Sequence, residues 1–136
     1  MEKSKLGFAF VKYSGRRVHL YLSILDLIKW DAAITKEKIL NPEDLQSMFT
    51  PVRLNNGGSL HPYGLGWYLN PVNGHKVIQL HGGSWQGYNS YIARFPDDKL
   101  SVILLMNLNP SNPGLIAKDI AALYIPGIKQ TKVCQL

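Results

Sequence analysis

The sequence predicts an α+β fold, in which an antiparallel β-meander of about four strands carries a C-terminal helix on one face. Three observations lead to this fold class. Runs of β-forming residues follow one another between residues 63 and 107 with only short turns between them, and short connections favour antiparallel pairing. Two segments with helix-start signals precede these runs, and a segment with helical spacing follows them.

The N-terminal segment, residues 1–22, holds two further β-forming runs, Leu6 to Tyr13 and Arg17 to Leu22. Ser14-Gly15-Arg16 between them is typical of a turn, so an N-terminal β-hairpin is expected.

Two helices are predicted before the sheet. Ser23 is a suitable N-cap, and Asp26 three residues later forms a variant of the capping box, so a helix is expected from Ile24 to about Ala33. Asn41 with Pro42 in the first turn starts a second helix, whose buried side is predicted to hold Leu45, Met48 and Phe49.

Four strands are then expected, with turns at Asn73-Gly74 and at residues 96–99. They are Tyr63 to Leu69, Lys76 to His81, Tyr88 to Phe95, and Leu100 to Asn107. The last strand is largely apolar on both faces, which requires cover on both sides of the sheet. The helices within residues 24–50, or material outside this chain, could supply the second cover.

The closing helix supplies the first cover. Asn112-Pro113-Gly114 is a start signal, and a helix to about Tyr124 is expected to bury Ile116, Ile120, Leu123 and Tyr124. Residues 126–136 form a basic tail.

Composition sets limits on function. With 136 residues, 46% of them hydrophobic, the chain can bury one core, and Cys134 alone cannot form an internal disulfide. The net charge of +6 lies in the two ends, because residues 21–126 carry eight basic and eight acidic residues. This distribution argues against specific nucleic-acid binding.

No apolar run is long enough for a membrane span or a signal peptide, so a cytoplasmic protein without membrane association is expected from this chain as given, although full-length relatives could be exported.

Metal and phosphate sites have little support in the sequence. The four histidines, His19, His61, His75 and His81, show no zinc-type spacing. The glycine pair Gly82-Gly83 lacks both the lysine-serine ending and the following helix of a phosphate loop. We therefore expect no metal and no cofactor.

The stretch from His81 to Tyr88 is the strongest candidate site. Its sequence, His-Gly-Gly-Ser-Trp-Gln-Gly-Tyr, joins two alternating runs, and its glycines indicate a tight bend or a close approach of the backbone to a ligand or to a neighbouring strand. Trp30, Trp67, Tyr63 and Phe49 read as packing residues. Trp85 is the better candidate for contact with a ligand or partner.

A series of motifs follows in one order along the chain: Asp26-Leu27-Ile28-Lys29-Trp30-Asp31, Leu45 to Pro51, Tyr63-Gly64-Leu65-Gly66-Trp67, His81-Gly82-Gly83 with Gly87-Tyr88, Phe95-Pro96-Asp97, and Leu105-Met106-Asn107. This order resembles the C-terminal part of the penicillin-recognising serine hydrolases, which include class C β-lactamases, D-alanyl-D-alanine carboxypeptidases and serine esterases. The resemblance covers residues 23–125, and residues 1–22 look unrelated to it.

The resemblance assigns roles to the glycine stretch. His81, Gly82 and Gly83 match the family's motif of lysine or histidine, a small residue and glycine on an active-site strand. This implies that His81 faces the substrate, that Gly83 lets the strand backbone approach it, and that the N–H of Ser84 supplies half of an oxyanion hole. Ligand contacts would then come from His81, Gly82, Gly83, Ser84, Trp85 and Tyr88.

The nucleophile of the family is missing from this chain. No serine is followed three residues later by lysine: Arg17 follows Ser14, Asp26 follows Ser23, and Thr50 follows Ser47. Tyr68-Leu69-Asn70 has the letters of the family's Tyr-x-Asn motif but comes too late in the chain. The vestigial residues His81, Gly83 and Ser84 therefore make no complete catalytic set.

Three functions stay open at this point. The first is a truncated serine-hydrolase-like domain without hydrolase activity of its own. The second is a binding or oligomerisation module that reuses the old active-site edge, or a hydrolase completed by a separate chain. Its partner would be a second copy of this chain or a complementing chain, and a small-molecule ligand would bind at the His81 edge. The third is an enzyme of another mechanism with His81 as general base and Ser84, Tyr88 or Asp97 as its partner.

Overall fold

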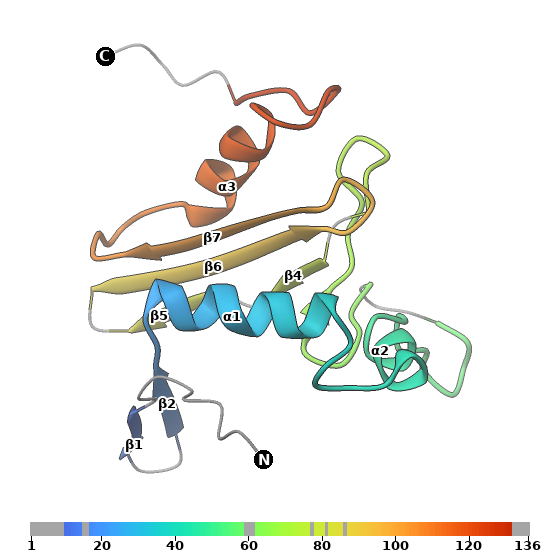
Figure 1. The fold of residues 1–136 in the computed structure, drawn as a ribbon, viewed down its shortest axis with the longest axis horizontal. Helices are drawn as coiled ribbons and strands as arrows, with labels where there is room; N and C mark the ends of the chain where they lie inside the picture. The colour runs from blue at the N-terminus through green and yellow to red at the C-terminus, as the bar shows by residue number, and fades with distance from the viewer. Residues whose placement is uncertain are drawn as a thin grey trace. The chain divides into compact units, whose positions relative to one another are not determined.

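The computed structural model describes residues 10–14, 17–58, 62–76, 78–80, 82–85 and 87–131 of the chain (Figure 1). The chain divides into two compact units, Met1–Ile39 and Leu40–Leu136. The boundaries predicted after residues 22 and 125 stay predictions.

The first unit begins with a β-hairpin. β1 (Phe10–Ser14) pairs antiparallel with β2 (Arg17–Tyr21), and Ser14 lies opposite Arg17. The predicted N-terminal hairpin is present, although residues 6–9 of its predicted first strand lie outside the described residues.

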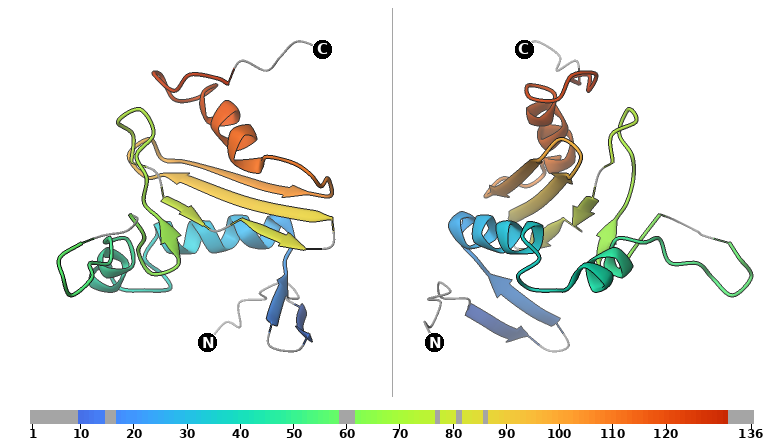
Figure 2. Two further views of the ribbon diagram at one scale, coloured as in Figure 1. Left: turned by 180° about the vertical axis from the view of Figure 1, so that it is seen from behind. Right: turned by 45° about the vertical axis from the view of Figure 1, so that its right-hand side comes forward.

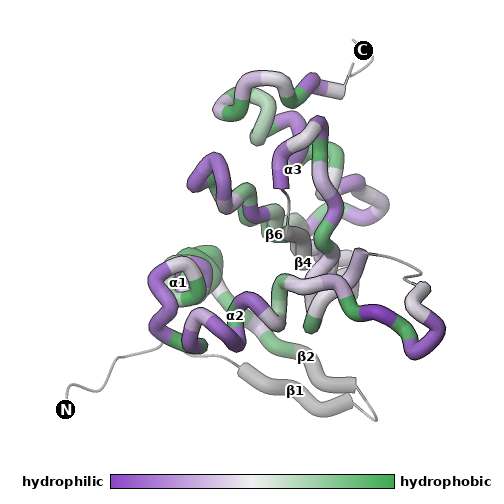
Figure 3. The backbone as a smooth tube through the Cα atoms, turned by 90° about the vertical axis from the view of Figure 1, so that its right-hand side faces the viewer, coloured by the Kyte–Doolittle hydropathy of each residue, from purple (hydrophilic) through white to green (hydrophobic). Residues whose placement is uncertain are grey.

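The helix of the first unit, α1 (Ile24–Thr35), starts at the predicted cap. The Asp26 backbone N–H donates to the Ser23 hydroxyl at 3.3 Å, and the Ser23 N–H donates to the Asp26 carboxylate at 3.2 Å. Both halves of the capping box are therefore made. The helix continues past Ala33, its predicted end, to Thr35. In Figure 3, green hydrophobic residues gather on one side of α1 and purple hydrophilic residues on the other.

The second unit is built on an antiparallel sheet of five strands, β3 (Trp67–Tyr68), β4 (Ile78–Leu80), β5 (Gly83–Trp85), β6 (Tyr88–Phe95) and β7 (Leu100–Met106). β7 pairs with β6 from Asn89 to Phe95. β4 and β5 both pair with the opposite edge of β6, and β3 pairs with β4 (Figures 1 and 2). The predicted α+β class with an antiparallel sheet is confirmed.

β4 lies within the predicted second strand, Lys76 to His81, whereas β5 is a further strand that was not predicted, separated from β4 by a change of register. Gln79 lies opposite Ala93 and Gly83 lies opposite Ser90, so four residue steps on this edge match three on β6. One extra residue in an antiparallel pair is a β-bulge, and bulges bend a strand and increase its twist. Pairing resumes at Gly83, where the sequence predicted a bend, and the hairpin turn comes later, at Gly87 with φ +88°.

The first predicted strand of the sheet is shorter than expected. Tyr63 to Leu69 was predicted, but only Trp67–Tyr68 forms β3, with Tyr63 joined to Tyr68 by an isolated bridge. Gly66 adopts φ +79°, a left-handed conformation that glycine accepts at low cost and that turns the chain before β3.

α3 (Pro113–Ala121) packs on one face of β6 and β7, as predicted. Its alanines line the interface, and Ala121 has 0% of its surface exposed. The buried cluster of this face comprises Ala93, Phe95, Val102, Ala117, Ala121, Ile125 and Ile128. The predicted apolar stripe was wrong for Ile116, Leu123 and Tyr124, which are exposed, and the helix ends before Tyr124. Small side chains let the helix lie close to the bulky residues of the sheet.

The opposite face of the sheet is covered around Arg94 by the end of α2 (Pro42–Met48), which begins after the predicted cap Asn41. Arg94 is only 7% exposed, and its guanidinium carbon lies 5.7 Å from the Phe49 ring centroid and 5.8 Å from that of Trp67. The two rings meet edge to face at 5.4 Å. The predicted packing role of Phe49 and Trp67 is confirmed, and the planar cation lies beside both aromatic rings.

Candidate functional site

The candidate site lies on the β5–β6 hairpin. In β5, Gly83 lies opposite Ser90, Ser84 opposite Asn89, and Trp85 opposite Tyr88. All residues of β5 are exposed, and in the described part of the chain no strand pairs with the outer edge of β5. The stretch chosen from the sequence is thus an accessible sheet edge next to a bulge, a place where strands often re-aim their side chains.

Gly83 makes the tightest contact of this hairpin. A Cβ atom at Gly83 would lie 2.7 Å from Ser90 Oγ, so the serine hydroxyl occupies the space that a side chain would need. The same hydroxyl accepts a hydrogen bond from the Gly83 N–H at 3.2 Å. The close approach predicted for the glycine pair is therefore made to the neighbouring strand on this face.

Trp85 and Tyr88 form a cross-strand pair at the end of the hairpin. Paired residues point to the same face of a sheet, and alternation places Ser90 and its partner Leu105 on that face too. Exposed fractions are 36% for Trp85, 64% for Tyr88 and 44% for Leu105. The hairpin end thus presents aromatic and aliphatic surface to solvent.

Ser84 is exposed and shares the α3 face of the sheet with Asn89. Within the described residues, no side chain makes a hydrogen bond with the Ser84 hydroxyl. A serine becomes a nucleophile only when a base or a charged neighbour activates it. The Ser84 hydroxyl is therefore not set up as a nucleophile, and the group that Ser84 can offer to a ligand is its backbone N–H.

His81 lies outside the described residues, so its predicted position facing a substrate stays a prediction. Asp97, one of its suggested partners, follows the far end of β6, whereas Ser84 and Tyr88 lie at the near end. Eight strand residues at about 3.4 Å each separate the two ends by roughly 25 Å. The structure therefore does not bring Asp97 together with Ser84 and Tyr88.

Asn89 fixes the loop beside this site, a role that sequence reasoning missed. Its side-chain amide donates to the Leu108 carbonyl and to Ser111 Oγ, both at 2.8 Å, and the residue is buried. The partners are 19 and 22 residues away, so no local pattern announces them. A buried asparagine with satisfied donors holds the connection between β7 and α3 against the hairpin.

A second polar pair lies at the far end of the sheet. His75 Nδ1 and Asp98 Oδ2 are 2.9 Å apart, and both side chains are about a quarter exposed. The pair joins the turn before β4 to the turn after β6. It lies at the opposite end of β6 from Ser84, and so it belongs to a different part of the surface.

Over the described ranges, no three His, Cys, Asp or Glu side chains gather closely enough to hold a metal ion. In the same residues, no helix has the length and apolarity that crossing a membrane requires.

The comparison with protein families gives the class of protein. Residues 8–125 match the family model described as Beta-lactamase, which is most of the chain. The chain belongs to the Beta-lactamase family. The match begins at residue 8, inside the segment 1–22 that the sequence pattern had left outside the resemblance.

Two relatives make this membership more specific. The chain is 37% identical over 82 residues to penicillin-binding protein 4* of Bacillus subtilis, in a match covering 60% of this chain and 18% of that protein. Its fold is similar to the octameric penicillin-binding protein homologue from Pyrococcus abyssi, with a TM-score of 0.63 and 26% identity over 83% of this chain and 29% of the other. The chain thus spans less than a third of the length of either relative.

Proposed function

We propose that β5 and His81 of this chain form one side of an acyl-transfer site, and that the chain has no hydrolase activity by itself. The observation that supports this most directly is the exposed strand β5, where Ser84 lies beside a bulge and, among the described residues, no strand pairs with the outer edge. A backbone N–H at such an edge can stabilise a developing oxyanion, which contributes roughly 3 kcal/mol in hydrolases. His81 would face the same substrate.

The missing activity follows from the missing nucleophile. The sequence contains no serine with a lysine three residues later, and the Ser84 hydroxyl has no activating partner among the described side chains. Without a nucleophile to add to the substrate carbonyl, neither the oxyanion nor a covalent intermediate can form. This side of the site would take part in acyl transfer only together with a segment or a separate chain that carries the nucleophilic serine.

The test uses the purified chain with nitrocefin, short p-nitrophenyl esters and a fluorophosphonate probe. We expect no turnover and no labelled serine. Addition of a separate chain that carries a Ser-x-x-Lys motif should then create activity that depends on His81. Labelling of any serine in the isolated chain would contradict the proposal.

A second candidate function is association through the same surface. Trp85, Tyr88 and Leu105 form exposed apolar surface on one sheet face, next to an edge strand, and such surfaces favour contact with another chain. The Pyrococcus abyssi homologue is described as octameric. On this basis, we suggest a homo-oligomer or a complex with a complementing chain.

Sedimentation over a range of protein concentrations tests this second candidate. Tyr88→Ser should shift the protein toward monomer. Tyr124→Ser is the matched control, because Tyr124 is exposed to a similar extent, 69%, but lies after α3. A monomer at every concentration, or equal effects of both variants, would exclude association through the hairpin.

A further inference from the structure

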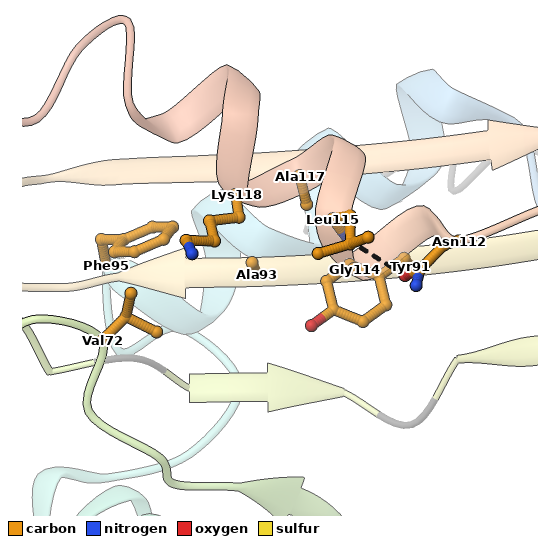
Figure 4. Close-up of a pocket in the computed structure, with 9 residues that line it drawn as sticks. All are labelled: Val72, Tyr91, Ala93, Phe95, Asn112, Gly114, Leu115, Ala117 and Lys118. Carbon is orange, nitrogen blue, oxygen red and sulfur yellow. Dashed lines mark hydrogen bonds between the residues drawn. The ribbon is translucent and has the colours of Figure 1, made fainter. Parts of the chain in front are cut away.

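A hollow separate from the β5 edge lies between α3 and the sheet (Figure 4). Its volume is about 260 Å³, and it is open to solvent on one side. Val72, Ala93 and Phe95 line its apolar part. Pockets for drug-sized ligands start at about 300 Å³, so this hollow suits a smaller molecule.

The hollow exists because α3 presents small residues to this part of the sheet. A Cβ atom at Gly114 would lie 3.6 Å from the Tyr91 hydroxyl oxygen, which is ordinary contact distance. A larger side chain at this position would extend into the space beside the Tyr91 ring. Gly114 therefore controls how much of the hollow stays open.

Tyr91 and Lys118 each bring to the hollow a polar group that has no partner in the described part of the chain. The Tyr91 hydroxyl makes no hydrogen bond there, and burial raises the pKa of Tyr91, which keeps the hydroxyl protonated as a donor. The Lys118 ammonium forms no ion pair there. Figure 4 shows both side chains on the wall of the hollow, Lys118 from α3 and Tyr91 from β6.

Neighbouring acceptor groups are already engaged. The Asn112 side-chain oxygen accepts the Leu115 N–H at 3.1 Å, and the Asp119 carboxylate accepts the Thr131 N–H at 2.6 Å. Among the described side chains that line the hollow, the donors without a hydrogen bond or ion pair are the Lys118 ammonium, the Tyr91 hydroxyl and the Asn112 side-chain NH2. Above an apolar floor, this set complements a carboxylate attached to a compact hydrocarbon body.

We propose that the hollow binds a small monocarboxylate with a compact apolar body, of which benzoate is the simplest probe. The carboxylate lies between the Lys118 ammonium and the Tyr91 hydroxyl, and the hydrocarbon part rests on Val72 and Phe95. This site lies on the α3 face of the sheet and does not depend on the proposed acyl-transfer role.

The test is a titration of the ¹⁵N-labelled full chain with benzoate, followed by amide chemical shifts. We expect saturable shifts at Gly114 and Lys118, and no comparable response to benzamide, which has the same shape without the charge. Absence of saturation, or equal binding of benzamide, would overturn the proposal.

Variants locate the site. Lys118→Gln should weaken benzoate binding roughly tenfold, because a charge-assisted hydrogen bond is lost. Lys129→Gln, at an exposed lysine outside the hollow, is the matched control and should leave binding unchanged. Tyr91→Phe should weaken binding less than Lys118→Gln does, and Gly114→Leu should abolish it by filling the space. If Gly114→Leu fails to fold, the lysine pair decides alone, and equal affinities of Lys118→Gln and Lys129→Gln would refute the site.

Discussion

The hydroxyl of Ser90 occupies the place where a side chain at Gly83 would begin, 2.7 Å from the ideal Cβ position. The same oxygen accepts the Gly83 N–H, so the contact is both a steric limit and a hydrogen bond. The glycine of the candidate site thus has a structural reason to be glycine that is independent of any substrate.

This contact predicts an effect of Gly83→Ala whose sign depends on residue 90. In the native background the methyl group displaces the Ser90 hydroxyl and breaks its hydrogen bond, which should lower the free energy of unfolding by about 0.5–1.5 kcal/mol. In a Ser90→Ala background the clash is gone. The reduced freedom of the unfolded chain should then make Gly83→Ala neutral or stabilising by about 0.5 kcal/mol.

Urea denaturation of the four proteins in this cycle measures the coupling. Gly87→Ala is the control, because Gly87 has φ +88° and alanine there should destabilise both backgrounds equally. Equal costs of Gly83→Ala in both backgrounds would show that Ser90 is not the limiting contact.

The buried amide of Asn89 predicts a strong effect of charge. Asn89→Asp places a carboxylate against the Leu108 carbonyl, where the native amide donates at 2.8 Å. We expect a loss of roughly 2–3 kcal/mol in unfolding free energy at neutral pH, with a smaller loss in acid, where the protonated acid can donate again. Asn70→Asp, at an exposed position, should change little. A similar loss in both variants would refute the role of the Leu108 and Ser111 contacts.

The position of Arg94 predicts that the planar shape of its guanidinium, as well as its charge, stabilises the fold on the sheet face opposite α3. Its guanidinium lies close to the Phe49 and Trp67 rings, so Arg94→Ala should cost roughly 2–4 kcal/mol in unfolding free energy through lost packing and cation–π contact. Arg94→Lys keeps the charge but loses the planar stacking surface, and it should recover only part of that stability. Thermal unfolding followed by tryptophan fluorescence would measure both. Full recovery with lysine would contradict the stacking argument.

The cap of α1 predicts an acid-sensitive helix. Hydrogen bonds from the Ser23 hydroxyl and backbone, with the charge of Lys29, hold the pKa of Asp26 below its ordinary value of 3.8. Because the folded-state pKa is depressed, the cap contributes stability above pH 3.8 and loses it as the pH falls through the lower, folded-state pKa. Far-UV circular dichroism should show helix loss in this range that is smaller in Asp26→Asn. Identical acid transitions in both proteins would argue against the cap as the cause.

Features that depend on neighbouring residues were predictable from the sequence. The starts of α1 and α2 follow from side chains that bond to backbone groups three residues away, Ser23 with Asp26 and Asn41 with Asp44. The hairpin with Trp85 and Tyr88 as the candidate site also follows from local alternation around Gly87.

Features that depend on distant partners were not predictable. The apolar spacing of α3 favoured Ile116 and Leu123, but the bulk of Tyr91 and Phe95 across the interface favours Ala117 and Ala121 instead. The Asn89 contacts and the His75–Asp98 pair join residues far apart in the chain. The register change between β4 and β5 is likewise set by pairing with β6, because no residue in that stretch encodes it alone.

Because of that register change, the shape of this sheet edge depends more on how many residues separate Gln79 from Gly83 than on which residues they are. Positions in a regular strand alternate between faces, so Gln79 and Ser84, five residues apart, would lie on opposite faces. The extra residue instead puts both opposite positions of β6 that lie on the α3 side, Ala93 and Asn89. Removing one glycine would remove the bulge and restore uniform alternation with the same pairing, so Ser84 would stay on the side of α3 and Trp85 on the other side, and only the bend of this edge would be lost.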